Sequence, residues 1–537
     1  MALSREEKII NVPPLDFTPD PRGIGCVLFD SMLKYQNNVA QIDGLNGKED
    51  LYRSLLQRSV RVALALQKRG IQYGDVVCLF TYNHLDSCTP VLAALFIGAI
   101  TVGIDEDSKK DESTYVFSKV KPKIVFTVHQ MGRMLESALK KTSQTAEIVV
   151  FGKSDKYVSF SEFLNPDVNE ECFLPVPAKA ITDTAMIFFT SGSTGLPKPM
   201  CHNHVSILYQ NNNLICANYD WTVSLEYTSP CWSIFFFFLI VTTTLGNTRL
   251  IYNAFNKTKI WDFAKYKTTF LFLSNSEIMT ACKVGRPKDL SLSHLKYVMT
   301  GGNVLSETQL IAIKSLFWEA DILFTYGQSE VPSFLTGFKP MFKNDRKLMQ
   351  KKITSVGLGC PGISYKIVSV DNEKILGQNE LGELRIKTVF SLGLLYNMDS
   401  SNLFDSDGWL KTGDLAYYDE DKCFYIVGRI KDMFKYQSFR IIPSTIEKVL
   451  LLHPAVENAI VIGVPHEIDG EHPMGVVLLK DEFKHVPAKQ IEKFVKRRVH
   501  FSHRLRAGVK ILEEFVKTST NKVNKKVMRD LIIEGKL

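Results

Sequence analysis

The segment FFTSGSTGLPKPM, residues 188–200, decides how this sequence of 537 residues is interpreted. Two phenylalanines typical of a buried strand give way to a run of glycines and hydroxyl side chains: Thr190, Ser191, Gly192, Ser193, Thr194 and Gly195. Consecutive backbone N–H groups in such a turn form a concave nest that binds phosphate oxygens, and Lys198 adds a positive charge. The segment is not a Walker A loop, because its glycines and lysine lack the GxxxxGK spacing. Taken alone, the segment fits either of two alternatives: a phosphate-binding loop or an ordinary surface connection.

Length and composition indicate a globular protein of two or more domains. A chain of 537 residues exceeds the size of one hydrophobic core. Its 45% apolar and 23% charged residues are close to the averages for soluble proteins. The ten cysteines are scattered without a CxxC pair, which favours a reducing compartment over a disulfide scaffold or a thiolate metal site. The charged start, MALSREEKII, is not typical of a secretory signal, so we expect no export.

Two apolar runs favour buried elements over membrane spans. The run at 91–105 contains two glycines and ends on an aspartate, and the run IFFFFLIV at 234–241 has eight residues. A spanning helix needs about 20 apolar residues. We therefore expect no transmembrane segment.

The net charge of +8 is concentrated in the last part of the chain. Residues 481–537 hold 15 Lys and Arg against seven Asp and Glu, so the preceding 480 residues are neutral overall. A nucleic-acid-binding protein more typically carries a broad basic patch with interleaved aromatics. We expect no nucleic-acid partner. Two interpretations of the basic region stay open: a mobile element that meets an anionic ligand, or a solvated helical face such as 489–498.

Alternating helix and strand patterns over the first 330 residues predict α/β layers with substantial parallel sheet. The apolar spacing in 50–72 predicts a helix that ends at Gly70. We also expect a strand at 76–82, a helix from about Leu85 and a strand at 100–104. After residue 355, short strands with turn residues predict a smaller β-rich unit. From Arg429 onward the pattern is typical of a compact α+β module.

Seven motifs follow one another along the chain: TSGSTGLPK (190–198), YVMTGGNVLS (297–306), FTYGQSE (324–330), GWLKTGDLAYYDED (408–421), YIVGRIKD (425–432), KYQSFRIIPSTIE (435–447) and KTSTNKVNKK (517–526). In this order they resemble the signatures of the adenylate-forming enzymes, which include acyl- and aryl-CoA ligases, nonribosomal adenylation domains and beetle luciferases. The resemblance runs from about residue 50 to the end. It implies an α/β fold in which residues 1–430 form an AMP-binding adenylation domain of layered α/β subdomains plus a small β-rich subdomain. Residues 431–537 would form a mobile α+β domain that carries the catalytic lysine.

The resemblance also implies roles for individual residues. The nucleotide would be bound by the phosphate loop, by Gly301 and Gly302 beside the adenine, and by Tyr326, Gly327, Gln328 and Ser329, with the Tyr326 ring stacked on the base. Asp414 would hold the ribose hydroxyls, Arg429 would contact ribose or phosphate, and Glu330 would bind magnesium. The catalytic lysines would be Lys198 in the loop, Lys522 in adenylation and Lys435 in the second step.

Four positions depart from the family pattern. Pro199 and Ser438 replace glycines, and Asn521 replaces the glycine before the lysine at 522. Ser329 replaces a threonine and keeps the hydroxyl. The segment 231–235, Cys-Trp-Ser-Ile-Phe, lacks the histidine of the luciferase pocket. His204 has the spacing of a histidine found in many relatives, and a structural role for it is equally open.

The resemblance implies an AMP-forming acid–CoA ligase that uses ATP, Mg²⁺ and coenzyme A on a carboxylic acid. The phenylalanines at 235–238 favour a hydrophobic acid, fatty or aromatic, if they form a pocket wall and not ordinary core. The alternatives are a luciferase-like monooxygenase, which adenylates and oxidises a luciferin, and a nucleotide-binding pseudoenzyme. The final Gly535-Lys536-Leu537 is close to a peroxisomal address, so we expect a peroxisomal or cytoplasmic location.

Overall fold

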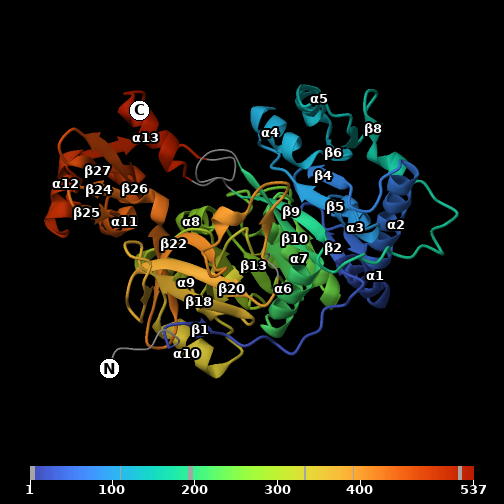
Figure 1. Cartoon of the computed structure of the whole chain (residues 1–537), viewed down its shortest axis with the longest axis horizontal. Coiled ribbons are helices and arrows are strands. Elements are labelled where there is room, and N and C mark those ends of the chain that lie inside the picture. Colours follow the sequence, from blue (N-terminus) through green and yellow to red (C-terminus); the bar gives the residue numbers. More distant parts are fainter. Residues whose placement is uncertain (1–6, 109, 191–196, 332–333, 391, 518–522) are drawn as a thin grey trace.

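Three sheets and their helices form the N-terminal body, and a fourth sheet belongs to the C-terminal unit (Figure 1). The computed structural model describes residues 7–108, 110–190, 197–331, 334–390, 392–517 and 523–537. The expected α/β class is confirmed. None of the helices in these ranges is long and apolar enough to cross a membrane.

The first sheet has eight strands, of which six are parallel in the order β9-β5-β4-β6-β7-β8. In spatial order the strands are β21 (Leu394–Leu395), β10 (Lys198–Asn203), β9 (Thr184–Thr190), β5 (Ile100–Gly103), β4 (Val76–Phe80), β6 (Ile124–Val128), β7 (Glu147–Phe151) and β8 (Val158–Ser159). Strand β4 is buried on both faces: Val77 and Leu79 belong to one core, and Val76, Cys78 and Phe80 to another. Such continuous apolar strands are typical of a parallel sheet covered by helices.

The second sheet has nine strands and is parallel from β2 through β15. Its order is β17 (Leu358–Gly359), β16 (Phe334–Gly337), β15 (Asp321–Gly327), β14 (Tyr297–Gly301), β13 (Phe270–Phe272), β11 (Val223–Glu226), β12 (Thr248–Ile251), β2 (Val39–Asp43) and β3 (Glu49–Leu51).

Helices separate and cover these two sheets. The layer between them contains α1 (Ile24–Lys34), α2 (Tyr52–Lys68), α3 (Thr89–Phe96), α6 (His204–Cys216) and α7 (Ser233–Leu245). The outer faces are covered by α4 (Lys110–Val120) and α5 (Gly132–Lys141) on the first sheet and by α8 (Asn275–Val284) and α9 (Glu307–Leu316) on the second. Helix α10 (Lys343–Lys351) follows β16. Both apolar runs are therefore interior: the first divides into α3 and β5, and the second lies within α7.

The predicted local elements are largely present, with one boundary that differs. The helix predicted over 50–72 is α2, and the two predicted strands are β4 and β5. The helix predicted from about Leu85 begins only at Thr89. Residues 84–87 form a turn instead, in which the Ser87 N–H donates to the His84 carbonyl at 3.0 Å, and Pro90 occupies the first helical turn, where proline is favoured.

The third sheet is antiparallel and corresponds to the predicted β-rich unit. It consists of β1 (Ile10–Asn11), β18 (Ile363–Val368), β20 (Gly382–Thr388), β22 (Leu410–Tyr418) and β23 (Phe424–Arg429), with β19 (Ile375–Leu376) paired to β18. The short η5 turn (Ile430–Asp432) then leads to the last sheet, so the predicted boundary at residue 430 lies in this turn.

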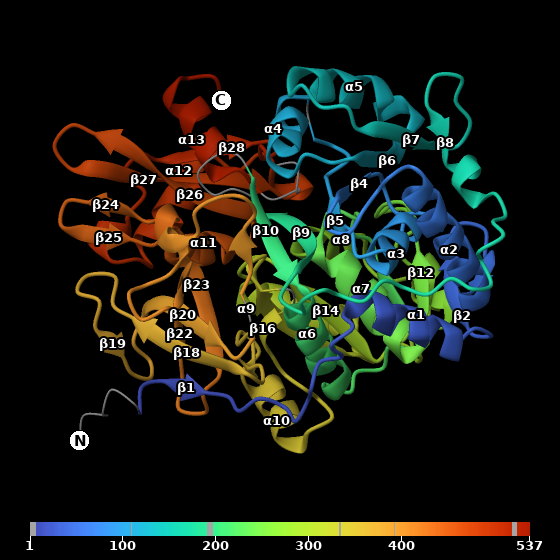
Figure 2. The ribbon, with the colours of Figure 1, turned by 45° about the vertical axis from the view of Figure 1, so that its right-hand side comes forward.

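The C-terminal sheet has the order β25 (Phe439–Ile441), β24 (Phe434–Tyr436), β27 (Gly470–Leu479) and β26 (Val456–His466), with β28 (Val509–Leu512) paired to β27. Helices α11 (Pro443–Leu451), α12 (Ala488–Lys496) and α13 (Lys525–Ile533) pack around it. In Figure 2 this unit, in orange-red and red, lies beside the third sheet and at a distance from the blue helices α1 and α2. It has its own hydrophobic core.

His204 joins the first turn of α6 to the start of α1. Its buried Nδ1 accepts a hydrogen bond from the Ile24 N–H at 3.2 Å. A Cβ on Gly23 would lie 2.8 Å from the same nitrogen, so the ring is closely packed. Burial lowers the pKa of His204 to about 4, which keeps the imidazole neutral and able to accept. The structural role is the one that these contacts support.

We expect the free energy of unfolding to fall as the pH falls from about 6.5 to 4. The folded pKa is below the unfolded pKa, so the unfolded state binds more protons over this interval and is favoured by acid. The difference in pKa corresponds to about 3 kcal/mol at most. His204→Asn, which keeps an acceptor but does not titrate, should show a weaker pH dependence in urea unfolding at pH 7 and 4.5. The exposed His485→Asn is the control; equal pH dependence in wild type and His204→Asn would contradict this account.

Candidate functional site

The predicted phosphate loop connects two antiparallel strands of the first sheet. β9 ends at Thr190, β10 begins at Lys198, and the two residues are paired across the hairpin. The Lys198 N–H donates to Thr190 Oγ1 at 3.3 Å. The roles predicted for Ser191, Gly192, Ser193, Thr194 and Gly195 stay predictions, because these residues lie outside the described part of the chain.

The carboxyl ends of β14 and β15 place the predicted adenine-side glycines beside the Tyr326 segment. Gly301, the last residue of β14, pairs with Thr325 of β15. A Cβ on Gly301 would lie 2.7 Å from the Thr325 carbonyl oxygen, so a larger residue would separate the strands. Gly302 has φ +105°, a conformation that favours glycine. Gly327 ends β15 and is exposed.

The Asp414 carboxylate is the centre of the described site. It is 2% exposed and lies on β22, opposite Arg429 of β23. Arg429 Nε lies 3.0 Å from Asp414 Oδ1, and the Tyr326 hydroxyl donates to Oδ2 at 2.6 Å. Because separate donors hold the two oxygens, the orientation of the carboxylate is fixed. Burial, followed by the Asp414 charge, raises the pKa of Tyr326 well above its usual range, so the phenol is a donor at neutral pH.

Glu330 lies within electrostatic range of several predicted site residues. Burial has the largest effect and raises the pKa of its carboxyl, while the charges of Arg429 and Lys198 lower it and that of Asp414 raises it. Carboxylate oxygens are preferred ligands of Mg²⁺, and a divalent cation would favour the ionised carboxylate. The residue therefore fits the metal-binding role, which stays a prediction.

Contacts from the first sheet hold the backbone of the YGQSE segment. His202 on β10 is buried, and its Nε2 donates to the Ser329 carbonyl at 2.8 Å. The Gly393 N–H donates to the Glu330 carbonyl at 2.9 Å. Gln328 Nε2 is buried, and no acceptor among the described residues is within hydrogen-bond distance of it. The segment that leaves β15 is thus attached to β10 and to the loop before β21.

Of the two predicted C-terminal lysines, Lys435 lies in the described part of the chain. Lys435 is exposed on β24, in the C-terminal sheet and not in any of the three sheets of the body. Lys522 lies outside the described residues. On either side of it in the sequence, Lys517 and Val523 form an isolated bridge, and Lys525 pairs with Glu447 at 2.7 Å.

Two family models match this chain. One, described as AMP-binding enzyme, matches residues 28–392, and the other, AMP-binding enzyme C-terminal domain, matches residues 445–522. The chain belongs to the AMP-binding enzyme family. The resemblance to the adenylate-forming superfamily is thereby confirmed.

Relatives of this AMP-binding enzyme include both luciferases and ligases. Luciferin 4-monooxygenase of Photuris pensylvanica is 28% identical over 552 residues, with 99% of each chain covered. Probable 4-coumarate–CoA ligase 1 of Dictyostelium discoideum is 27% identical, with 92% of each chain covered. The solved structure of the luciferase-like enzyme from the nonluminescent Zophobas morio mealworm is 37% identical, with a TM-score of 0.75 over 79% of this chain and all of that one.

Two of the glycines expected from the family pattern are replaced in described regions of this AMP-binding enzyme, at Pro199 and Ser438. Pro199 has no N–H to donate, but it pairs with Phe189 on β9, and its carbonyl accepts from the Tyr396 N–H at 2.9 Å, so β10 remains paired at this residue. Ser438 is exposed in the turn between β24 and β25. Asn521 lies outside the described residues.

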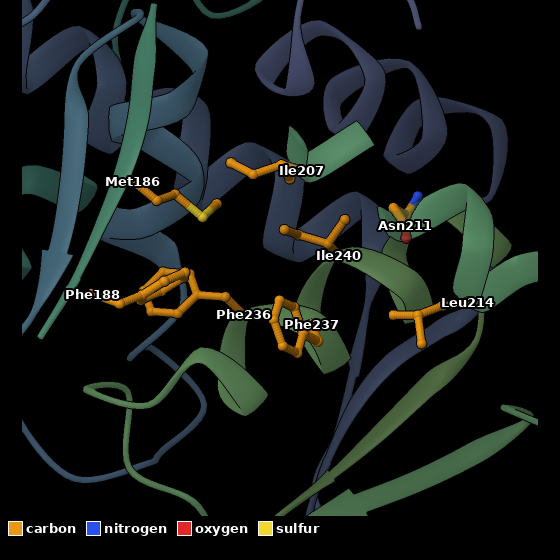
Figure 3. A pocket seen from close by; sticks show the side chains of 8 residues that line it. All are labelled: Met186, Phe188, Ile207, Asn211, Leu214, Phe236, Phe237 and Ile240. Carbon is orange, nitrogen blue, oxygen red and sulfur yellow. The ribbon is translucent and has the colours of Figure 1, made fainter. Parts of the chain in front are cut away.

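The phenylalanine run at 235–238 divides between two environments. Phe236 and Phe237 line a cavity of about 10 Å³ between β9, α6 and α7, together with Met186, Phe188, Ile207, Asn211, Leu214 and Ile240 (Figure 3). This volume suits at most one water molecule. Phe235 and Phe238 are fully buried core residues that do not line it. The expected four-residue pocket wall is therefore half core, and a hydrophobic acid would enter this cavity only after side chains such as Phe237 move.

Two supporting residues of this AMP-binding enzyme did not emerge from the motifs as contributors to the site. Thr412 Oγ1 accepts from the Asp414 N–H at 3.1 Å, and the TGD string contained that residue without indicating its contact. No local sequence pattern indicated that Gly393 contacts the site. A Cβ there would lie 2.9 Å from the His202 ring, so the tight packing requires glycine.

Tyr326→Phe should weaken ATP binding about tenfold, because it removes a hydrogen bond to a buried charge that orients the carboxylate. Titration calorimetry with an α,β-methylene ATP analogue measures the effect. Tyr425→Phe is the matched control. The Tyr425 hydroxyl also donates to a carboxylate, that of Asp419, at 2.9 Å, on the sheet that carries Asp414. An unchanged dissociation constant in Tyr326→Phe would show that Arg429 alone is sufficient.

Proposed function

We propose that this protein is an ATP-dependent acid–thiol ligase that forms an acyl-adenylate and transfers the acyl group to coenzyme A. One observation supports the proposal most directly. Tyr326 and Arg429, on two different strands, both contact the buried carboxylate of Asp414 on a third strand. An oriented carboxylate suits the vicinal hydroxyls of a ribose, and the buried Gln328 amide offers a further donor. The family match supports a nucleotide ligand.

In the first step a carboxylate oxygen of the acid attacks the α-phosphorus of ATP. The bond from this phosphorus to the bridging oxygen breaks, and pyrophosphate leaves with the electron pair. Negative charge spreads over the phosphoryl oxygens in the transition state, so positioning and electrostatic stabilisation provide most of the catalysis. Lys198 and the backbone of the phosphate loop would supply positive charge there, and Lys522 would add the ammonium that contacts the reacting phosphoryl group.

Magnesium fits the same site. Bound to Glu330, Mg²⁺ would neutralise phosphate charge during attack. This chain contributes the carboxylate, the backbone contacts of residues 329 and 330, and the nearby charges of Arg429 and Lys198. His202 keeps the segment in place as a neutral donor, since burial lowers its pKa to about 4.

In the second step a thiolate attacks the acyl carbon, the bond to the AMP oxygen breaks, and AMP leaves. Lys435 is exposed on the C-terminal sheet, and in the second step the C-terminal unit would change position to bring it to the adenylate, as the family resemblance implies. The η5 turn between β23 and β24, which contains Lys431 and Asp432, is the natural pivot. Likeness to a probable 4-coumarate–CoA ligase supports coenzyme A as the thiol.

The acid that we propose is hydrophobic. Apolar side chains of β9, α6 and α7 support this class. They surround a water-sized cavity beside the strand that leads into the phosphate loop, and this cavity would admit an acyl group once Phe237 moves. A panel of fatty and aromatic acids should therefore be better substrates than short polar acids.

A luciferase-like monooxygenase is the second candidate, favoured by the likeness to luciferin 4-monooxygenases over 99% of the chain. Trp232 and Ser233 occupy the segment where luciferases carry the pocket histidine, which favours the ligase. Oxygen-dependent consumption of a supplied luciferyl-adenylate would support the monooxygenase. Nucleotide binding without any turnover would support the pseudoenzyme.

The two half-reactions should depend on different lysines. Lys522→Ala should slow acyl-AMP formation on the order of 10²- to 10³-fold, as expected for a lost transition-state donor, and spare thioester formation from supplied acyl-AMP. Lys435→Ala should do the reverse. Single-turnover measurements with pre-formed adenylate separate the two steps.

Lys448→Ala, a change in α11 of the same C-terminal unit, is the control and should leave both steps unchanged. Equal losses in both steps for Lys522→Ala would overturn the division between lysines. Loss of adenylation in every variant and in the wild type would overturn the ligase itself.

A further inference from the structure

Two histidines and an aspartate converge at the hairpin between β26 and β27. His466 is the last residue of β26, and Val464 pairs with His472 of β27. Since side chains two residues apart on a strand share a face, His466 and His472 lie on the same face as diagonal neighbours. Their rings are stacked with centroids 3.8 Å apart. Asp469, in the three-residue turn, faces both rings.

The Asp469 carboxylate is the point of convergence. Its Oδ2 lies 2.8 Å from His472 Nε2 and 3.7 Å from His466 Nδ1. One nitrogen from each histidine and one carboxylate oxygen all lie within 4.8 Å of one another. In a tetrahedral Zn²⁺ site with bonds of about 2.0–2.1 Å, ligand atoms are about 3.4 Å apart. Small rotations of side chains would close the remaining difference. His466 is 41% exposed, and its Nδ1, which accepts a hydrogen bond from the Asp469 N–H at 3.3 Å, would exchange this contact for the metal.

We infer that His466, Asp469 and His472 form a binding site for a borderline divalent transition metal such as Zn²⁺. Two imidazoles and a carboxylate favour Zn²⁺, Cu²⁺ or Ni²⁺ over the oxygen-seeking Mg²⁺. The three side chains leave one coordination position for water. The site belongs to the C-terminal sheet and is distinct from the Glu330 region.

A supporting contact holds the carboxylate, as outer-shell partners do in metal sites. Gln437 Nε2 donates to Asp469 Oδ1 at 2.8 Å, which leaves Oδ2 directed at the histidines. The Gln437 N–H also donates to the Asp469 carbonyl at 2.7 Å. Gln437 has φ +52°, so the backbone of this turn adopts an uncommon conformation to make both contacts.

Metal ions and protons compete for the same ligand atoms of the cluster. Only a neutral imidazole and an ionised carboxylate bind a metal, and His472 Nε2 already faces the Asp469 carboxylate at 2.8 Å. Metal binding should therefore weaken as the pH falls.

The site is structurally connected to the hairpin that carries Lys435. Tyr436 pairs with Gly470, and a Cβ on Gly470 would lie 3.0 Å from the Lys435 carbonyl oxygen. A bound ion would therefore stiffen the turn against which β24 packs. The metal-binding test below is independent of the proposed ligase activity.

Titration calorimetry of the full, untagged chain with ZnCl₂ at two pH values tests the inference. We expect one Zn²⁺ per chain, bound more weakly at the lower pH. His466→Ala, Asp469→Asn and His472→Ala should each weaken binding at least about tenfold, and Gln437→Ala about 10- to 100-fold. His485→Ala, an exposed histidine of the same unit, should bind as the wild type does.

A second cluster, Asp105, Glu106 and Cys231, provides the competing location. Loss of binding in Cys231→Ser with retention in the His466→Ala/His472→Ala double variant would overturn the inference, as would no Zn²⁺ binding at 100 µM, about the weak limit of a specific site. A Co²⁺ spectrum with a thiolate charge-transfer band would do the same, and its absence with histidine-dependent d–d bands would support the site. Circular dichroism of each variant verifies that it is folded.

Discussion

A buried carboxylate must have donors, and Asp414 receives them from two other strands. Tyr326 comes from the second sheet and Arg429 from the neighbouring strand of the third, so satisfying one charge requires both sheets to meet in a single register. An uncompensated buried carboxylate would cost several kcal/mol. The same contacts orient the oxygens toward whatever occupies the site. The stability of the fold and the geometry of the site therefore depend on the same carboxylate. This junction, where the second and third sheets meet at Asp414, suits a nucleotide site.

The first sheet joins the junction through backbone contacts. His202 and Gly393 hold the carbonyls of Ser329 and Glu330, which places the strand pair of the phosphate loop beside the end of β15. Positive charge from Lys198 and Arg429 reaches Glu330 across this junction. Adenylation chemistry needs such a concentration of charge near phosphates, whereas thioester formation needs a thiol and a different lysine. A separate C-terminal sheet that carries Lys435 behind a short turn is consistent with dividing the two tasks.

Sequence patterns predicted the features that depend on local periodicity or on short motifs. Helix α2 and strands β4 and β5 follow from the spacing of their apolar residues, and the motif residues Gly301, Tyr326, Asp414 and Arg429 do gather in space. The hydrogen bond from Tyr326 to Asp414 joins residues 88 positions apart, and no local pattern indicates it. The phenylalanines at 235–238 are identical in sequence, yet helical geometry directs two to a cavity and two to the core. The pairing of His466 with His472 appears only once the hairpin register is known.

The central claim, that this junction activates carboxylic acids with ATP, is tested most directly by ATP–pyrophosphate exchange with the wild-type chain over a panel of fatty, aromatic and short polar acids. The account predicts incorporation of labelled pyrophosphate into ATP that depends on the acid and is strongest for hydrophobic members. Measurable nucleotide binding with no acid-dependent exchange across the whole panel would contradict it.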